Sequence, residues 1–254
     1  MIRLRHIYGV LCLGLLFSAS ALGAVSLAGT RLIFDGKFRE VSIEASNRGD
    51  KEVLLQAWLS DDPGQVATPD NLPFVVTPHL VYLRAQGKQS LRLLYEGVGM
   101  PTDRESLLYL YVMEIPRRSE AQQQLTIAVR QRINVFYRPA GLRGDPADAA
   151  QTLSWQLAEG LRGEFYLRVR NPTLFHVSLL ALQLDGLQVS DHLLIKPGEA
   201  ISVPLARSLR AARLSFKALT DYGGQRSYCV ELNGDQPPAA QLTTHNAHPL
   251  KGKC

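Results

Sequence analysis

The chain is poor in the residues that catalysis and metal binding require. It has three cysteines and six histidines among 254 residues, and no His and Cys cluster has the spacing of a metal site. No Gly-rich phosphate loop opens a helix, and no Gly-x-Ser-x-Gly elbow presents a nucleophile. The charged stretch at residues 103–106 has no nucleophile and base beside it. We therefore predict no enzyme, no catalytic residue, no cofactor and no metal.

Long apolar runs are also scarce, and the one that stands out lies at the start of the chain. A basic head precedes an apolar run at residues 10–17, which is too short to span a membrane comfortably. Small residues follow, so we interpret residues 1–23 as a signal peptide that is cut before Ala24; an uncleaved anchor is the alternative. Because no second run of this kind follows, the mature chain is predicted to be exported without inserting in a membrane.

Basic charge is in slight excess and forms no block. The formal net charge is +5, and we interpret the positive charge as local, on the polar face of the long strand at residues 125–137. A small excess without a basic block is a weak signal for a nucleic-acid partner, so we predict no nucleic acid.

Only two cysteines, Cys229 and Cys254, lie beyond the predicted signal peptide. In an exported protein an even pair favours a disulfide. Closing a loop of that length stabilises the fold by roughly 3 kcal/mol if the bond is unstrained. Two free thiols remain the alternative, because Cys254 is the last residue of a polar tail.

The chain does contain many short runs in which apolar and polar residues alternate, separated by turn residues. In residues 24–139 the predicted strands are 31–34, 40–45, 53–59, 74–76, 80–83, 90–95, 107–115 and 125–137. In residues 151–234 they are 153–157, 164–169, 176–184, 192–195, 200–203, 212–217 and 225–232. Residues 140–150, rich in Gly, Pro, Asp and Ala, are interpreted as a linker, and 235–254 as a disordered polar tail. The pattern predicts an all-β fold of two sandwiches.

The longest run, at residues 125–137, has one apolar and one polar, basic face. Its odd positions carry Leu125, Ile127, Val129, Ile133 and Val135, and its even positions include Arg130, Arg132 and Asn134. Pro139 ends the strand, because proline cannot donate to a ladder. A strand of this kind recruits another chain when it lies at a sheet edge. The function therefore depends on whether one edge of this strand is free.

Several segments together match one family of exported proteins in order and spacing. They are Thr30-Arg31-Leu32-Ile33-Phe34-Asp35-Gly36, Gln56-Ala57-Trp58, Asp103-Arg104-Glu105-Ser106-Leu107, Glu114-Ile115-Pro116, Arg132-Ile133 before Phe136-Tyr137-Arg138-Pro139, and Asp221-Tyr222-Gly223-Gly224. On these motifs the chain resembles the periplasmic chaperones of the chaperone–usher pilus pathway, from residue 24 to about residue 234. The loop before the long strand is short and lacks cysteine, which resembles the short-loop class of that family.

The resemblance implies two immunoglobulin-like sandwiches set at an angle, with a cleft between them. It also implies that the long strand completes a pilus subunit that lacks its last strand, which is donor-strand complementation. Leu125, Ile127 and Val129 then enter the groove of the subunit, and their full burial is worth about 5–9 kcal/mol as an upper bound. From the residues alone, the alternative is that these three side chains face the domain's own core.

The resemblance also implies an anchor for the terminal carboxylate of the subunit. In the family an Arg on the first strand and a Lys on the donor strand hold this group in the cleft. Arg31 matches the arginine, but the lysine position is Asn134, which can hydrogen-bond a carboxylate and brings no charge. Arg132, on the same face of the strand, is the candidate for the missing charge.

Two further features follow from the resemblance. Glu105, Arg138 and Asp221 match positions that form a charge cluster between the two domains of the family; without the resemblance they would read as unrelated surface charges. Related chaperones often carry a disulfide near the end of the second domain with much closer spacing than that of Cys229 and Cys254. A bond between these two cysteines would therefore be unusual.

We expect a periplasmic chaperone that binds pilus subunits without nucleotide and delivers them to an outer-membrane usher. An exported adhesion or ligand-binding protein built from two sandwiches is the alternative, and a hydrolase on a β scaffold is a more distant one. The sequence leaves open whether free molecules cap the exposed strand by forming a dimer.

Overall fold

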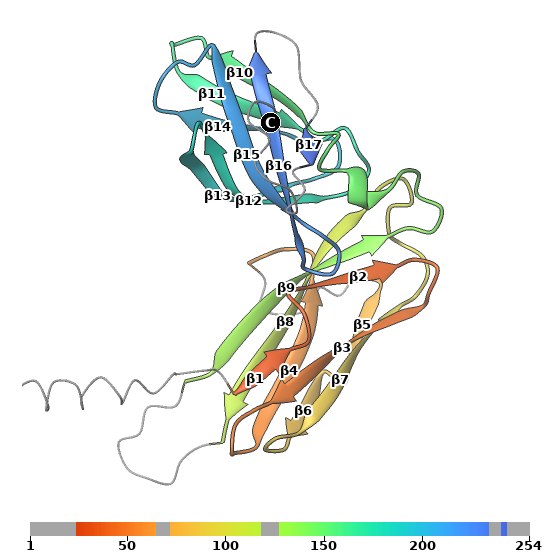
Figure 1. Cartoon of the computed structure of the whole chain (residues 1–254). Helices are drawn as coiled ribbons and strands as arrows, with labels where there is room; N and C mark the ends of the chain where they lie inside the picture. The colour runs from red at the N-terminus through yellow and green to blue at the C-terminus, as the bar shows by residue number, and fades with distance from the viewer. Residues whose placement is uncertain (1–23, 65–71, 118–126, 234–239, 243–254) are drawn as a thin grey trace, which may run out of the picture.

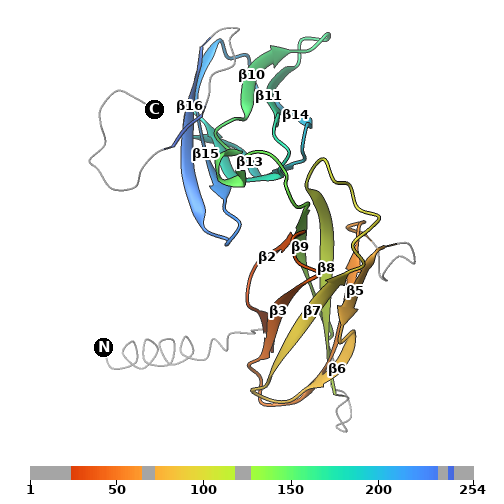
Figure 2. The same ribbon diagram turned by 90° about the vertical axis from the view of Figure 1, so that its right-hand side faces the viewer.

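A computed structural model describes residues 24–64, 72–117, 127–233 and 240–242. Two β-sandwiches follow one another along the chain and lie end to end at an angle (Figures 1 and 2). The predicted signal peptide, Leu125 and Cys254 lie outside the described residues. Within those residues, no helix combines the length and the apolar character needed to cross a bilayer. The prediction of an all-β fold with two sandwiches is confirmed.

The first sandwich packs a four-stranded sheet against a five-stranded sheet. The four-stranded sheet contains, in spatial order, β1 (Val25–Leu27), β3 (Glu40–Asn47), β7 (Lys88–Tyr95) and β5 (Phe74–Thr77). The five-stranded sheet contains β2 (Arg31–Asp35), β9 (Val129–Arg138), β8 (Ser106–Pro116), β4 (Val53–Ser60) and β6 (Leu80–Leu83). Apolar residues that alternate along both sheets fill the core, among them the buried Phe34, Leu91 and Leu110.

The chain changes sheets between its first two strands. β1 pairs antiparallel with β3, whereas β2 pairs parallel with β9, from Arg31 opposite Asn134 to Asp35 opposite Arg138. β2 therefore covers only the second half of β9. Among the described residues, the first half, Val129–Ile133, is paired on one edge only, with β8. We call this segment the free half of β9.

β9 begins at Val129, later than the predicted start at residue 125. Ile127 and Ala128 are described and lie outside the strand. In the antiparallel register that places Val129 opposite Glu114, Ile127 would face Pro116, the last residue of β8. Proline has no N–H to donate, so the ladder lacks a partner at that point. Pro139 ends the strand at Arg138, as the sequence predicted.

The second sandwich has a three-stranded and a five-stranded sheet. The three-stranded sheet contains, in spatial order, β10 (Ser154–Glu159), β11 (Phe165–Arg170) and β14 (Ala200–Leu205). The five-stranded sheet contains β13 (Leu187–Ile195), β12 (Val177–Leu184), β15 (Ala211–Leu219), β16 (Gln225–Asn233) and β17 (Gln241–Leu242). A 3-10 turn (Pro146–Asp148) leads into it, and Ala149 and Ala150 are buried in its core. The sequence did not predict β17, which directly follows the buried Ala240 and pairs with β16. This part of the predicted polar tail is therefore a strand of the second sandwich.

The turn between β15 and β16 reaches the junction of the two sandwiches (Figure 1). Gly223 in this turn has a positive φ of 78°, which suits glycine. A Cβ atom at Gly223 would lie 3.4 Å from Thr30 Oγ1 of the first sandwich. The second sandwich therefore touches the first at the point where β2 begins.

Candidate functional site

Exposed apolar side chains lie at the start of the long strand. Ile127 is 62% exposed, and Val129 is partly buried. Farther along the same alternation, Ile133 and Val135 are buried in the core of the first sandwich. The apolar positions of this alternation therefore lie in two environments, solvent at Ile127 and the domain core at Ile133 and Val135. Ile127 does not face the core of its own domain.

A groove of about 640 Å³ separates the free half of β9 from the segment that joins β1 to β2. Residues 25–30 line one side, and Val129, Gln131 and Ile133 are among the residues that line the other. Gln131 spans it by donating from Nε2 to the carbonyl oxygen of Val25, at 2.8 Å. A strand from another protein could pair with the open edge of β9 at this place.

A pocket of about 240 Å³ lies between the two sandwiches, beside the point where β2 begins to cover β9. The first sandwich contributes Arg31, Glu105, Phe136 and Arg138 to its lining, and the second contributes His176, Asp221 and Arg226. The groove and the pocket thus adjoin the same strand, one at its open half and the other at its covered half.

Arg31 lines this pocket with part of its guanidinium unsatisfied. The group lies over the ring of Phe136, 5.5 Å from its centroid, and the buried Nε has no hydrogen-bond partner in the described chain. Burial lowers the pKa of Arg31, and the nearby charges of Asp221 and Glu105 offset only part of that effect. Both carboxylates are bonded to Arg138 instead. A carboxylate that entered from outside would therefore find an unpaired charge-assisted donor.

Asn134 and Arg132 differ in how they relate to Arg31. Asn134 lies directly opposite Arg31 in the parallel ladder and is partly buried. Arg132 is exposed; its guanidinium lies 5.1 Å from the ring centroid of Tyr109, and Nη1 donates to the carbonyl oxygen of Pro63 at 3.3 Å. The structure thus brings Asn134 to Arg31 and directs Arg132 elsewhere.

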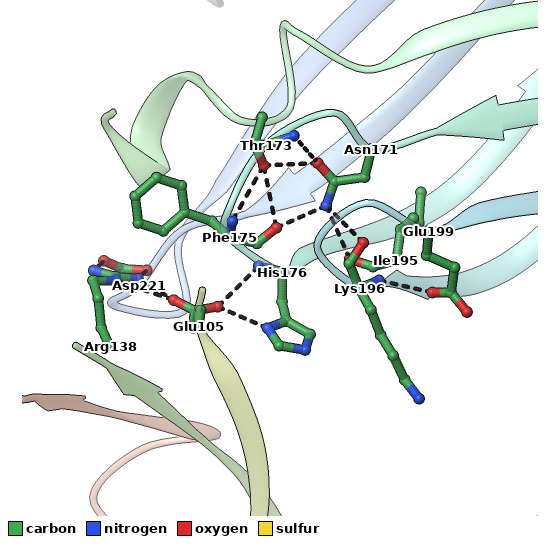
Figure 3. Close-up of polar contacts among 10 residues, drawn as sticks. All are labelled: Glu105, Arg138, Asn171, Thr173, Phe175, His176, Ile195, Lys196, Glu199 and Asp221. Atoms are coloured by element: carbon green, nitrogen blue, oxygen red, sulfur yellow. Dashed lines mark hydrogen bonds and ion pairs between the residues drawn. The ribbon is translucent and has the colours of Figure 1, made fainter. Parts of the chain in front are cut away.

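The charges of Glu105, Arg138 and Asp221 meet at the junction of the sandwiches (Figure 3). Arg138 donates from Nε and Nη2 to Glu105 Oε2 at 3.0 and 2.9 Å. The same guanidinium donates from Nη1 and Nη2 to Asp221 at 2.8 and 3.1 Å. Arg138 therefore uses its planar donor set to join a carboxylate of each domain, an arrangement that a lysine could not reproduce.

The cluster is desolvated, and this sets its electrostatics. The Glu105 side chain is 2% exposed and that of Arg138 is 18% exposed. Burial alone lowers the pKa of Arg138, but the hydrogen bonds that it donates to Asp221 and the charge of Glu105 outweigh this effect, so the pKa lies above its ordinary value. The guanidinium therefore stays charged and paired with both carboxylates.

Sequence reasoning missed His176, the fourth member of this cluster. Its backbone N–H and its Nδ1 each lie 2.9 Å from Glu105 Oε1, and the ring is almost fully buried (Figure 3). The loop that presents it is shaped by Asn171, whose Nδ2 donates to the carbonyl oxygens of Phe175 and Lys196. A lone histidine at the start of a strand carries no signal of this contact, because Glu105 lies far away in the sequence.

Cys229 lies in the buried part of β16 and takes part in a disulfide. Its predicted partner, Cys254, lies outside the described residues. The pairing of these two cysteines therefore stays a prediction.

Two family models match the chain in sequence. The model for the N-terminal domain of PapD, a pili and flagellar-assembly chaperone, matches residues 24–143. The model for the C-terminal domain of the pili assembly chaperone PapD matches residues 148–230. Together these matches span both sandwiches.

Relatives and solved structures agree with the two models. The chain is 34% identical over 225 residues to the probable fimbrial chaperone YadV of Escherichia coli K12, covering 82% of this chain and 89% of that protein. The crystal structure of the Pseudomonas aeruginosa CupB2 chaperone has a TM-score of 0.68 at 31% identity, covering 82% of this chain and 100% of that one. The Salmonella enterica SafB chaperone, solved in complex with the SafA pilin, shares the fold with a TM-score of 0.69 at 24% identity, covering 89% of this chain and 99% of that one.

Proposed function

The chain belongs to the PapD-like family of pilus-assembly chaperones, and we propose that it binds unfinished pilus subunits by lending them the open edge of β9. Members of this family are chaperones and not enzymes. The protein stabilises fimbrial subunits until they are passed to an outer-membrane usher. We place this work in the periplasm, after residues 1–23 have been removed as a signal peptide.

The observation that carries the proposal is the half-covered strand. β2 pairs with Asn134–Arg138 and leaves Val129–Ile133 bonded on one edge only, within the part of the chain that the structure describes. The exposed Ile127 precedes this segment, and the unsatisfied Arg31 lies where its open edge ends. A subunit strand on this edge gains main-chain bonds, apolar burial and a charged anchor for its terminus.

The direct test is co-expression with the neighbouring exported proteins, followed by amide-exchange mapping of the chaperone with and without the pilin that co-purifies. Bound pilin is expected to slow exchange along residues 127–133. If the pilin instead protects a different face and leaves these amides unchanged, the donor-edge proposal fails.

Ile127→Asp is expected to weaken pilin binding by at least about 30-fold, because it removes a buried aliphatic contact and forces a charge into an apolar groove. Stability should change by no more than about 0.5 kcal/mol, since Ile127 is 62% exposed in the free chain. Binding is measured by titration with the co-purified pilin, and stability by thermal unfolding.

Leu187→Asp is the matched control for this substitution. Leu187 is 64% exposed in β13 of the second sandwich, away from the donor edge. The Leu187→Asp substitution should leave pilin binding unchanged. A collapsed thermal transition in the Ile127 variant would assign that side chain to the chaperone's own core and contradict the proposal.

We assign the carboxylate anchor to Arg31 with help from Asn134, so Asn134→Lys is expected to preserve binding or tighten it by up to about tenfold. An ammonium at this position adds a charge-assisted bond to the subunit terminus, although it also repels Arg31 in the empty pocket. Asn134→Met is the control, because methionine is similar in length to lysine but carries no charge, and this variant should not tighten binding. A large loss with lysine on titration would give Asn134 a different role.

A further inference from the structure

The polar face of β9 carries two arginines that the anchor does not use. Arg130 and Arg132 are exposed, and each lies over an aromatic ring of the neighbouring strand β8. The Arg130 guanidinium is 5.4 Å from the ring centroid of Tyr111, and that of Arg132 is 5.1 Å from the ring centroid of Tyr109. Both are in the range of cation–π contacts.

The two contacts are diagonal across the ladder. Arg132 is paired with Tyr111 and Arg130 with Met113, yet each guanidinium lies over the aromatic ring at the next position of β8 on this face. Diagonal neighbours of this kind are within reach of long side chains. Both arginine side chains therefore lean in the same direction along β8. Each contacts the residue of β8 that lies two positions from its own ladder partner.

The ring of Tyr111 is itself held in place. Tyr111 is buried and stacks on Trp58 of β4, with ring centroids 5.2 Å apart and an interplanar angle of 10°. Its hydroxyl donates to the carbonyl oxygen of Pro63 at 2.6 Å, and Arg132 donates to that same oxygen. The loop after β4 thus links both arginine contacts to a rigid part of the sheet.

The opposite face of the same segment is tied to β1. Gln131 donates to the carbonyl oxygen of Val25, and the Val25 N–H donates to Glu114 Oε2 at 2.9 Å. Glu114 is almost fully buried and lies opposite Val129 in the ladder. Side chains therefore hold the free half of β9 from both faces, while its second edge pairs with no strand among the described residues.

We propose that Arg130 and Arg132 are positioning residues that hold the free half of β9 extended on β8 before a subunit arrives. The inference deepens the proposed function and rests on it for its biological meaning. A strand bonded on one edge frays more readily than one bonded on both, and a donor that frays must be ordered again at each binding event. Clamping it against Tyr109 and Tyr111 leaves the open edge ready to pair.

The test begins with the free protein, so that it does not depend on a subunit. Amide exchange is compared between the wild-type chain and Arg130→Gln/Arg132→Gln, for those amides of Val129–Ile133 that bond to β8. The variant is expected to exchange about tenfold faster at these amides, the change that loss of two exposed cation–π contacts predicts. The thermal transition should be retained, because both arginines are exposed.

Two controls distinguish the effect of the cation–π contacts from the effect of charge and from a general loss of stability. Arg92→Gln removes an arginine that pairs with Glu40 on the other sheet, and should leave exchange in the free half of β9 unchanged. Arg130→Lys/Arg132→Lys keeps the charge but loses the planar group that stacks on the rings, and should restore protection only in part. Unchanged exchange in the glutamine variant would overturn the inference.

Titration with the co-purified pilin completes the test. The glutamine variant is expected to bind about tenfold more weakly, in proportion to its faster exchange. Weaker binding without faster exchange would mean that the arginines touch the subunit directly, which overturns a positioning role. Failure of the proposed function is recognised by a different result. In that case Ile127→Asp would leave pilin binding intact, whereas the amide-exchange result on the free protein would be unaffected.

Discussion

Replacing Arg31 by alanine is expected to abolish recovery of the pilus subunit while the chaperone stays folded. The Arg31 guanidinium stacks on Phe136, and its Nε is buried without a partner in the described chain. Its charge is thus held in a desolvated pocket before the subunit carboxylate arrives. Removing one member of such a pair costs about 2–5 kcal/mol of binding free energy, or about 30- to several thousand-fold in affinity. Co-purification of the pilin and thermal unfolding measure the two effects.

Arg31→Lys distinguishes charge from geometry at the same position. A lysine keeps the positive charge but cannot form a bidentate bond or the same stacking contact, so binding should recover only in part. Arg92→Ala is the control for loss of an arginine elsewhere in the domain and should recover the pilin as the wild type does. Equal recovery of the pilin by Arg31→Ala would remove Arg31 from the anchor.

Glu105→Ala is expected to have the largest effect on stability. The Glu105 carboxylate accepts from Arg138 within its own sandwich and from His176 of the other, and its side chain is 2% exposed. Its removal leaves the largely buried charge of Arg138 with Asp221 as its carboxylate partner, and it takes away the acceptor of the His176 backbone N–H. Breaking a buried ion pair by deleting one partner costs about 3–5 kcal/mol.

The same substitution should also loosen the junction between the sandwiches. Thermal unfolding is expected to begin at a lower temperature and to separate into two transitions, because the domains lose a shared contact. Small-angle scattering should show a wider range of domain orientations, and pilin binding should weaken. Glu40→Ala, which breaks the exposed pair with Arg92, is the matched control and should change none of these measurements appreciably. A single transition at the wild-type temperature in Glu105→Ala would show that the cluster does not hold the junction.

Several features of the candidate site were visible in the sequence. Arg31 and the cluster residues Glu105 and Arg138 lie in motifs that resemble those of the family, and Asn134 takes the place of the family's lysine. The structure places Arg31 beside Asn134 and Glu105 beside Arg138. The roles of these residues in binding a subunit remain proposals. His176 was not visible, because what distinguishes it is its contact with a carboxylate from the other sandwich.

Arg132 shows why residue type and spacing are not enough. It lies on the same face of the strand as Asn134, which made it the candidate for the missing charge. Its long side chain instead lies over Tyr109 and bonds to the loop after β4. A flexible side chain can reach several neighbours, and only the three-dimensional arrangement selects among them.

The sequence by itself determined the strands and the fold class, because alternation with a period of two and turn residues are local properties of the chain. It also determined the end of β9, since Pro139 cannot continue a ladder wherever the strand lies. Only the tertiary structure decided that β2 covers Asn134–Arg138 and that, within the described part of the chain, Val129–Ile133 pairs on one edge. Pairing partners come from distant parts of the chain, so whether an edge is free is a property of the folded sheet and cannot be read from the strand alone.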